Sequence, residues 1–319
     1  MKKINIFILQ TTARFSLLIK YLSFVILFSP TSAWTQNVQT NSVEFLIIGD
    51  WGGSASDGQK AVGISMSKEA EKIKARFVVT AGDNFHNDGI ASASDPRWKT
   101  EFEDVYDFPS LRIPWHPSLG NHDYRGNVDC EIEYSKLSTR WKFPSRYYAQ
   151  KENIDDSNYL LIVHLDTTPF IKNYQREADI YHVENQDINR QLYWLDSVLT
   201  FSGARWTIVV GHHSIYAAAS NHGNTQELTD KILPILTKHH VPLYVCGHYH
   251  VAQRLIRGAT NFVVCGGGSS AGSVDQREDV VFGAGSLGFL SVSVSSENIR
   301  LKIINEKSDI LYAFQISDN

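Results

Sequence analysis

The sequence feature that most constrains the fold is a short apolar run that ends in a glycine-containing turn. Each run is rich in β-branched residues, and each turn carries Asp, Asn or His. The runs are Val43–Ile48, Phe77–Thr80, Leu111–Pro117, Trp206–Val210 and Leu243–Val245, and their turns are Gly49-Asp50, Gly82-Asp83-Asn84, Gly120-Asn121-His122, Gly211-His212 and Gly247-His248. Short apolar runs bounded by glycine are typical of buried strands. We therefore predict strands whose ends carry the chemically distinctive side chains.

Segments with helical periodicity separate these runs. The residues that share one helical face are Val62, Met66, Ala70 and Ile73 in one segment, and Ile188, Leu192, Leu195 and Leu199 in another. Strands that alternate with helices predict an α/β fold, in which ligands bind beyond the carboxyl ends of the strands. The last strand-like runs, Phe262–Val264, Phe289–Val294, Ile299–Ile304 and Ile310–Phe314, have little helix between them. We predict that these runs are antiparallel strands that close a second sheet.

The N-terminus has the pattern of a secretory signal. The positive charges are Lys2, Lys3, Arg14 and Lys20. The short apolar core that follows is Tyr21–Phe28, and the small-residue cleavage site is Thr31–Ala33. The apolar core is too short to span a bilayer, which disfavours the alternative of a retained membrane anchor. We predict a signal peptide at residues 1–33, a single domain at residues 34–319, and a periplasmic or secreted protein without membrane attachment after cleavage.

The charge of the predicted mature chain disfavours nucleic acid as a partner. Residues 1–33 contain four basic and no acidic residues, so their removal takes the formal charge from −4 to −8. Phosphate backbones are neutralised by Lys and Arg, which argues against general nucleic-acid binding. Bound metal ions can still provide the local positive charge that a small phosphorylated substrate or a phosphoprotein needs.

Two other features leave alternatives open. The three cysteines are Cys130, Cys246 and Cys265, so at least one is unpaired; Cys246 and Cys265 are interpreted as small buried residues, although a disulfide between them is a possibility. The segment Gly266–Ser273 lacks the ending of a phosphate-binding P-loop. We interpret it as a flexible loop near the site entrance, with anion binding through backbone N–H groups as the alternative.

The turns together supply more ligands than one metal ion needs. They offer carboxylate, amide and imidazole groups without thiolates, a set that suits Fe, Mn or Zn. His248 and His250 are two residues apart, so on an extended segment they point the same way and can face adjacent ions. Asp83 follows a central strand and is the natural bridging carboxylate. The sequence therefore predicts a site for two metal ions, which suits phosphoryl transfer.

The ordered series of motifs resembles the calcineurin-like metallophosphoesterases, and within them the animal-type, tartrate-resistant-like purple acid phosphatases. The matching segments are GDWGG at 49–53, AGDNF at 81–85, GNHDYRGNVDCEIEYSKLSTRWKFP at 120–144, QLYWL at 191–195, VVGHHSIYAAASNHG at 209–223 and CGHYH at 246–250. The similarity covers roughly residues 43–310. It implies a four-layer α-β-β-α sandwich of two mixed sheets with helices outside.

The resemblance also implies a role for each matching residue. The first metal ion is expected on Asp50 and His250, the second on Asn121, His212 and His248, with Asp83 bridging both; His122 and His222 are expected to be catalytic. His213 has no ligand counterpart and is interpreted as a structural or supporting residue.

His86 is the one clear departure from the family pattern. The purple colour of the family comes from a tyrosinate bound to ferric iron three residues after the bridging Asp, and here His86 holds that position. We interpret His86 as a metal ligand, because it is placed to reach the same ion; the alternative is that it forms a hydrogen bond nearby and binds no metal. A neutral ligand at this position favours two divalent ions.

These observations predict an exported, acid-phosphatase-like hydrolase that cleaves phosphate monoesters by attack of a metal-bound hydroxide. His122 or His222 is expected to protonate the leaving alcohol. The alternatives are a phosphodiesterase or nucleotide hydrolase of the same superfamily, and a binding module that has kept the fold without catalysis. The last alternative predicts degraded ligand positions, whereas all of them are filled here. The sequence does not specify the physiological substrate, the metals or the oligomeric state.

Overall fold

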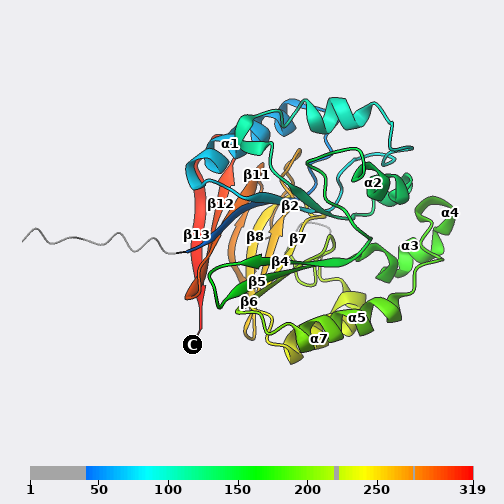
Figure 1. The fold of residues 1–319 in the computed structure, drawn as a ribbon. Coiled ribbons are helices and arrows are strands. Elements are labelled where there is room, and N and C mark those ends of the chain that lie inside the picture. The colour runs from blue at the N-terminus through cyan, green and yellow to red at the C-terminus, as the bar shows by residue number, and fades with distance from the viewer. Residues whose placement is uncertain (1–40, 219–222, 276, 319) are drawn as a thin grey trace, which may run out of the picture. The chain divides into compact units, whose positions relative to one another are not determined.

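Two mixed β-sheets lie face to face between two layers of helices (Figure 1). The computed structural model describes residues 41–218, 223–275 and 277–318, and the predicted signal peptide at residues 1–33 lies outside them. The first sheet has the order β13-β12-β11-β1-β2-β3. Its strands are β1 (Val43–Ile48), β2 (Phe77–Ala81), β3 (Trp115–Ser118), β11 (Gly288–Val294), β12 (Asn298–Asn305) and β13 (Ile310–Ser317). Strands β1, β2 and β3 are parallel, and β11, β12 and β13 are antiparallel to their neighbours.

The second sheet has the order β10-β8-β9-β7-β6-β5-β4. Its strands are β4 (Tyr148–Asn153), β5 (Tyr159–His164), β6 (Trp206–Val210), β7 (Leu243–Cys246), β8 (Ala252–Arg257), β9 (Thr260–Cys265) and β10 (Val280–Ala284). Strands β5, β6, β7 and β9 form a parallel centre, and β4, β8 and β10 pair antiparallel at the two ends. The sequence patterns found the parallel strands β6, β7 and β9 but not β4, β5, β8 or β10.

Helices cover the outer face of each sheet. The described α-helices are α1 (Asp57–Ile73), α2 (Val128–Tyr134), α3 (Lys172–Arg176), α4 (Ala178–Tyr181), α5 (Ile188–Phe201), α6 (Gln226–Lys231) and α7 (Leu233–Lys238). The 3-10 helices are η2 (Pro109–Leu111), η3 (Asp123–Arg125) and η4 (Thr168–Phe170), and η1 (Trp98–Glu103) is a π-helix. Both helices expected from periodicity, α1 and α5, are present.

Side chains that alternate along each strand build three hydrophobic layers. On β1, Phe45 and Ile47 point between the two sheets, whereas Leu46 and Ile48 point toward α1. A third layer lies between the second sheet and the helices α5 to α7. Strands that are buried on both faces must be apolar at every position, which explains why their sequences show continuous apolar runs. The three layers make the expected four-layer α-β-β-α sandwich, so the predicted fold class is confirmed.

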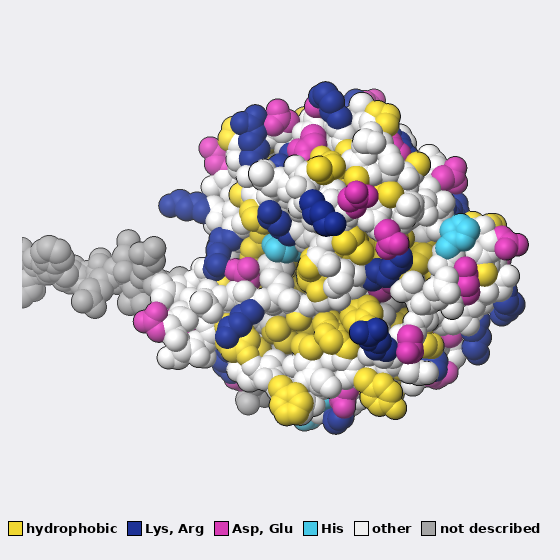
Figure 2. All heavy atoms as spheres, turned by 45° about the vertical axis from the view of Figure 1, so that its right-hand side comes forward, with side chains coloured by type: hydrophobic (Ala, Val, Ile, Leu, Met, Phe, Trp, Pro, Cys, Tyr) yellow, Lys and Arg dark blue, Asp and Glu magenta, His cyan; other side chains and the backbone are white. Residues whose placement is uncertain are grey.

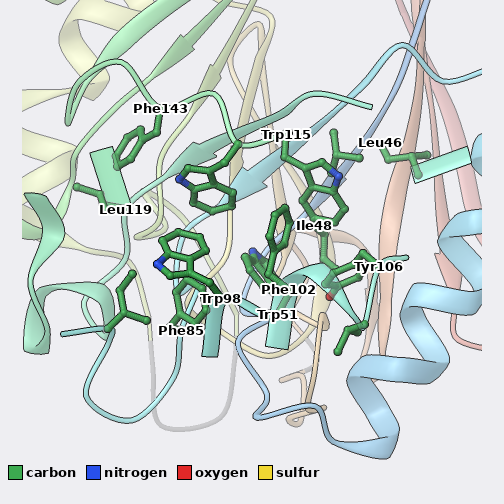
Figure 3. Packing of buried hydrophobic residues seen from close by; sticks show 14 of the residues in the cluster. Leu46, Ile48, Trp51, Phe85, Trp98, Phe102, Tyr106, Trp115, Leu119 and Phe143 are labelled. Atoms are coloured by element: carbon green, nitrogen blue, oxygen red, sulfur yellow. The ribbon is translucent and has the colours of Figure 1, made fainter. Parts of the chain in front are cut away.

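An aromatic cluster supports the first two turns of the candidate site (Figure 3). Trp51 follows Asp50, and its indole ring lies 5.5 Å from the ring of Phe85 and 5.7 Å from that of Phe102. Phe85 in turn lies 4.8 Å from Trp98. Buried aromatic pairs of this kind contribute about 0.5–1.5 kcal/mol each beyond the burial of their area. The aromatic residues of the motifs GDWGG and AGDNF therefore fix the loops that carry Asp50 and Asp83.

Two predictions about the strands were wrong in part. The run Leu111–Pro117 is a 3-10 turn that ends at Leu111, followed by a strand that begins only at Trp115. Pro109 starts this turn, and proline favours such positions because it has no N–H group to place in a sheet. The antiparallel strands β11 to β13 do not close a second sheet; they extend the first sheet from β1.

All three cysteines are free and buried. Cys246 points into the layer under the helices, and Cys265 points between the two sheets. Because successive side chains of a strand alternate between faces, these two thiols lie on opposite sides of one sheet. The disulfide that the sequence left open is therefore absent for a geometric reason.

The surface mixes charges of both signs. On the face drawn in Figure 2, Lys and Arg side chains are interspersed with Asp and Glu, and apolar side chains cover part of the lower half. Two aromatic side chains of α5, Tyr193 and Phe201, are 77% and 84% exposed. In the described part of the chain, no helix has the length and apolar character needed to cross a membrane.

Candidate metal centre

The turns that follow β1, β2, β3, β6 and β7 meet at one edge of the sandwich. Asp50, Asp83 and His248 have positive φ angles of 54°, 50° and 70°. Residues other than glycine adopt this left-handed conformation at an energetic cost, and such strain is concentrated at functional sites. The predicted ligands from distant parts of the sequence are brought into contact.

Each of the two carboxylates uses one oxygen for a backbone N–H group and leaves the other oxygen facing histidines. Asp50 Oδ2 accepts a hydrogen bond of 2.8 Å from the backbone N of His248, and Asp83 Oδ1 accepts one of 2.9 Å from the backbone N of His122. The other oxygen of Asp83 lies 3.3 Å from His212 Nε2 and 3.6 Å from His86 Nε2. The other oxygen of Asp50 lies 3.4 Å from His250 Nε2 and is buried without a hydrogen-bond donor. These two free oxygens are suited to bind cations.

Two turn glycines allow this close approach. A Cβ atom on Gly247 would lie 2.3 Å from Asp50 Oδ2, and one on Gly120 would lie 2.1 Å from Asp83 Oδ1. Both distances are below van der Waals contact, so a side chain at either position would displace a carboxylate. The glycines of the motifs GNH and GHYH are therefore required by packing against Asp83 and Asp50, and not only by the turns themselves.

His212 is surrounded by groups that accept hydrogen bonds. Its Nδ1 lies 2.9 Å from the carbonyl oxygen of Ala81, which can only accept, so Nδ1 carries the proton. In the neutral ring, Nε2 then presents a lone pair. That atom lies 3.2 Å from Asn121 Oδ1, 3.2 Å from His248 Nδ1 and 3.3 Å from Asp83 Oδ2. Nitrogen and oxygen atoms that converge this closely are suited to share a metal cation.

His86 and His250 complete the arrangement on the other side of Asp83. The ring of His86 lies 5.4 Å from that of His250, and His86 Nε2 is buried without a hydrogen-bond partner. His86 Nε2 also lies 3.6 Å from Asp83 Oδ2, so the geometry fits both a metal ion shared with Asp83 and the alternative of an interaction with that carboxylate. In the described residues, four overlapping groups have ligand atoms within 4.8 Å of one another; they are Asp50, His86 and His250; Asp83, His86 and His122; Asp50, Asp83 and His212; and His212, His213 and His248.

The pKa values of Asp83 and His212 indicate that positive charge stabilises the site. Burial alone would raise the pKa of Asp83, but the charge of His212 and close contacts with His212 and His86 hold the pKa well below its usual range. Burial alone would lower the pKa of His212, but Asp83 outweighs it and raises this pKa to about 9. Without a cation, the buried carboxylate thus takes its positive charge from a protonated histidine. The donor set of nitrogen and oxygen atoms fits a divalent or trivalent metal ion in that role.

The two residues expected to be catalytic differ in what the structure shows. His122 Nδ1 lies 3.0 Å from the carbonyl oxygen of Asn87, which leaves Nε2 as the nitrogen available to a substrate. Its ring is 4.9 Å from that of His86, so it borders the cluster. His222, the second expected catalytic residue, lies outside the described residues.

His213 lies next to the cluster with both ring nitrogens in hydrogen bonds. Its Nδ1 lies 2.9 Å from Thr167 Oγ1, and its Nε2 lies 3.3 Å from the hydroxyl of Tyr174. Its ring lies 4.5 Å from that of His248. With both nitrogens in hydrogen bonds, His213 is held beside the predicted ligands, and its interpretation as a structural or supporting residue stays a prediction.

Several supporting residues were missed by sequence reasoning. Asn84 is buried and links the turns: its Oδ1 accepts from Thr80 and Trp51, and its Nδ2 donates to the carbonyl of Ser118 and to Asp123 and Glu131. The loop Gly266–Ser273, interpreted as flexible, instead supports the site. Ser269 Oγ donates to the backbone oxygen of Asp50 over 2.7 Å, and Ser270 Oγ contacts His250 Nδ1. The sequence signal was present in AGDNF and in the Gly-Ser run, but only contacts reveal these roles.

Comparisons with known proteins agree on the fold. Residues 43–252 match the calcineurin-like phosphoesterase family. The solved structure of GAP50, described as the anchor in the inner membrane complex of Plasmodium, has a TM-score of 0.78 at 23% identity, and the match covers 88% of this chain and 90% of that one. A purple acid phosphatase, PPD1 from yellow lupin seeds, has a TM-score of 0.65 at 16% identity, with 88% and 54% covered. At these identities the two structures support the fold alone.

Sequence relatives narrow the family. The chain is 35% identical to purple acid phosphatase 7 of Arabidopsis thaliana over 289 residues, which covers 86% of each protein. It is 36% identical to the tartrate-resistant acid phosphatase type 5 of Sus scrofa over 252 residues, which covers 74% of this chain and 72% of the relative. Such relatives are metal-dependent phosphoric monoester hydrolases. This chain therefore belongs to the purple acid phosphatases of the calcineurin-like phosphoesterase superfamily.

Proposed function

We propose that this chain is an exported phosphatase that hydrolyses phosphate monoesters with two divalent metal ions. The observation that carries the proposal is the group of potential metal-ligand atoms at the edge of the sandwich, two of which are buried without hydrogen-bond partners. Asp50 Oδ1 and His86 Nε2 are buried without hydrogen-bond partners, and His212 Nε2 faces three other electron-rich atoms. Buried polar groups are normally paired, so their convergence here supports a bound cation.

The ligands would divide into two sets that share Asp83. Asp50, His86 and His250 would hold one ion, and Asn121, His212 and His248 would hold the other. The distances support this division, because the rings of His86 and His250 lie 5.4 Å apart, whereas His212 Nε2 lies 3.2 Å from both Asn121 Oδ1 and His248 Nδ1. When bound, two such ions supply an activated water and neutralise the charge of a phosphate group.

The formal charge of the ligands supports divalent ions. Asp50 and Asp83 provide two negative charges, and the histidines and Asn121 are neutral ligands. Without a phenolate there is no strong anionic donor to stabilise ferric iron. Two divalent ions, such as Fe(II), Mn(II) or Zn(II), therefore match this ligand set best.

His122 and His222 would act on the substrate itself. His122 Nδ1 is fixed by the carbonyl of Asn87, so its Nε2 is oriented to contact a phosphate oxygen or the oxygen of the leaving group. A histidine that borders the cluster in this way is suited to protonate the departing alkoxide. We assign the same role or charge stabilisation to His222 from its place in the motif NHG.

The proposal is tested by metal analysis combined with one substitution. Asp83→Asn should lose most of the bound metal and nearly all monoesterase activity, because an amide cannot neutralise two cations. Asp156→Asn, which changes an exposed carboxylate between β4 and β5, is the matched control and should keep both. Two metal ions per chain and normal turnover in the Asp83 variant would refute the binuclear assignment.

Substrate choice and export need separate measurements. Hydrolysis of 4-nitrophenyl phosphate without hydrolysis of bis(4-nitrophenyl) phosphate supports the monoesterase, and the reverse result supports the phosphodiesterase alternative. N-terminal sequencing of the protein after expression with its complete N-terminus tests cleavage after Ala33. A chain that retains Met1 to Ala33 would argue against the proposed signal.

A further inference from the structure

Arg125 lies beside the candidate metal centre, and no carboxylate of the described residues is within ion-pair distance of it. It ends the 3-10 helix η3, and its backbone N donates to the carbonyl oxygen of His122 over 3.1 Å. Arg97, Arg140 and Arg146 each form an ion pair with a carboxylate, whereas Arg125 forms none among the described residues. Its Nε is also buried without a hydrogen-bond partner. A partly buried guanidinium with an unused donor is a site for an anion.

Aromatic residues hold this guanidinium in place. Arg125 Nη2 donates to the hydroxyl of Tyr181 over 2.9 Å, and its Cζ lies 5.4 Å from the centre of the Tyr181 ring. Tyr181 on α4 is buried and lies 4.3 Å from the ring of Tyr174 on α3. The hydroxyl of Tyr174 reaches His213, which neighbours the ligand His212. The short helices α3 and α4 at the right of Figure 1 therefore form a wall that connects Arg125 to the metal centre.

The position of Arg125 indicates that it faces the leaving group of a substrate and not the phosphate that is hydrolysed. The hydrolysed phosphate must contact the metal ions that the residues around Asp83 would hold. Arg125 is not within ion-pair distance of that carboxylate, although its backbone N contacts the carbonyl oxygen of His122. It thus lies outside the ligand cluster but close to the residue proposed to protonate the leaving oxygen. This is the side on which the alcohol part of a substrate would extend.

We propose that Arg125, held by Tyr181, binds a second anionic group on the leaving alcohol, so that the preferred substrates are phosphate monoesters that also carry a carboxylate or another phosphate. This inference rests on the proposed function, because it concerns the same site. Arg125 is a specificity-determining residue in this proposal, and Tyr181 is a positioning residue that acts through it.

The test compares two substrates of equal shape and different charge. They are 4-carboxyphenyl phosphate and 4-carbamoylphenyl phosphate, and the measured quantity is kcat/KM for each with the metal-loaded protein. Arg125→Met should lower kcat/KM for the carboxylate substrate by roughly 10- to 100-fold, as expected for a lost charge-assisted hydrogen bond, and leave the carbamoyl substrate within about twofold. Arg125→Lys should restore part of the difference, because it keeps the charge but not the planar fork. Tyr181→Phe should cause a smaller loss in the same direction.

Arg112→Met is the matched control, because Arg112 is exposed and pairs with Asp107 on the surface. It should change neither substrate. Equal losses on both substrates in Arg125→Met, or no loss on either, would overturn the proposal. Binding of 4-carboxyphenylphosphonate and 4-carbamoylphenylphosphonate, measured by calorimetry, gives the same comparison without turnover. If the wild type hydrolyses neither ester, the proposed function fails, and the phosphonate affinities still decide whether Arg125 recognises the carboxylate.

Discussion

The backbone amide of His248 donates a hydrogen bond of 2.8 Å to the carboxylate of Asp50, although 198 residues separate the two in sequence. The same arrangement joins the amide of His122 to Asp83. In each case a turn glycine allows the backbone to approach the carboxylate, and the bond selects which carboxylate oxygen remains free. The proposed metal centre is thus assembled from pairs of strand ends, each locked by one backbone hydrogen bond.

Gly247→Ala should disrupt the hydrogen bond between the backbone amide of His248 and the carboxylate of Asp50. The new Cβ would lie 2.3 Å from Asp50 Oδ2, so the carboxylate must move away from the amide of His248. We expect bound metal to fall below one ion per chain, with a loss of monoesterase activity of at least tenfold, measured by elemental analysis and 4-nitrophenyl phosphate hydrolysis.

The control is Gly258→Ala, at a position with φ of 59° where the added Cβ meets nothing within 4 Å. Its left-handed backbone conformation should cost about 1–2 kcal/mol of stability without affecting metal content. Equal metal loss in both variants would show that the effect is general destabilisation and not displacement of Asp50.

The wild type is expected to be active and colourless, with a pH optimum nearer neutral than acidic, because divalent ions acidify bound water less than ferric iron does. His86→Tyr should shift the preference toward ferric iron and introduce visible absorption, since His86 Nε2 lies 3.6 Å from Asp83 Oδ2, on the side where a phenolate could bind. His86→Phe is the control, because it keeps an aromatic ring without a ligand atom. Wild-type protein that purifies with stoichiometric ferric iron and a strong visible band would contradict this expectation.

His122→Ala should lower turnover by roughly 10²–10⁴-fold on alkyl phosphates, as removal of a general acid does. The loss should be much smaller on 4-nitrophenyl phosphate, whose leaving group scarcely needs a proton. Steady-state kinetics on both esters provide the measurement. An equal loss on both would argue that His122 positions phosphate instead of donating a proton.

Stability should fall as the pH drops below 6.5, with His164 as one cause. Burial, and secondarily the charge of His116, hold the pKa of His164 well below its ordinary value of 6.5, so the folded state favours the neutral ring. The unfolded chain binds a proton that the folded chain excludes. The stabilisation is therefore complete above pH 6.5 and is lost as the pH falls toward the folded-state pKa.

The measurement is urea unfolding of metal-free protein between pH 7.5 and 4.5. His164→Gln should show a weaker loss of stability across this range than the wild type, even if it is less stable at pH 7.5, because the hydrogen bond to Ser118 changes. The exposed His182→Gln variant should retain the wild-type dependence. An unchanged slope in His164→Gln would exclude His164 as a source of acid sensitivity.

Much of the fold could be predicted from the sequence, because buried parallel strands require apolar side chains on both faces. The runs Val43–Ile48 and Trp206–Val210 match the observed strands residue for residue. Strand β4 was missed because it is an edge strand, in which exposed polar side chains such as Lys151 alternate with buried ones. The sheet that receives β11 to β13 was also unpredictable from their pattern, since apolar runs record burial and not the identity of the partner strand.

At the candidate site, the sequence by itself determined which residue types stand at the strand ends, since the motifs from GDWGG to GHYH place Asp, Asn and His after glycine in order. Only the tertiary structure decided which atoms face one another. The orientations of Asp50, Asp83 and His212, and the position of Arg125 with its Nε lacking a hydrogen-bond partner, depend on hydrogen bonds between residues far apart in sequence. A side chain's chemistry is local, but its availability for a ligand depends on which partners the fold has already given it.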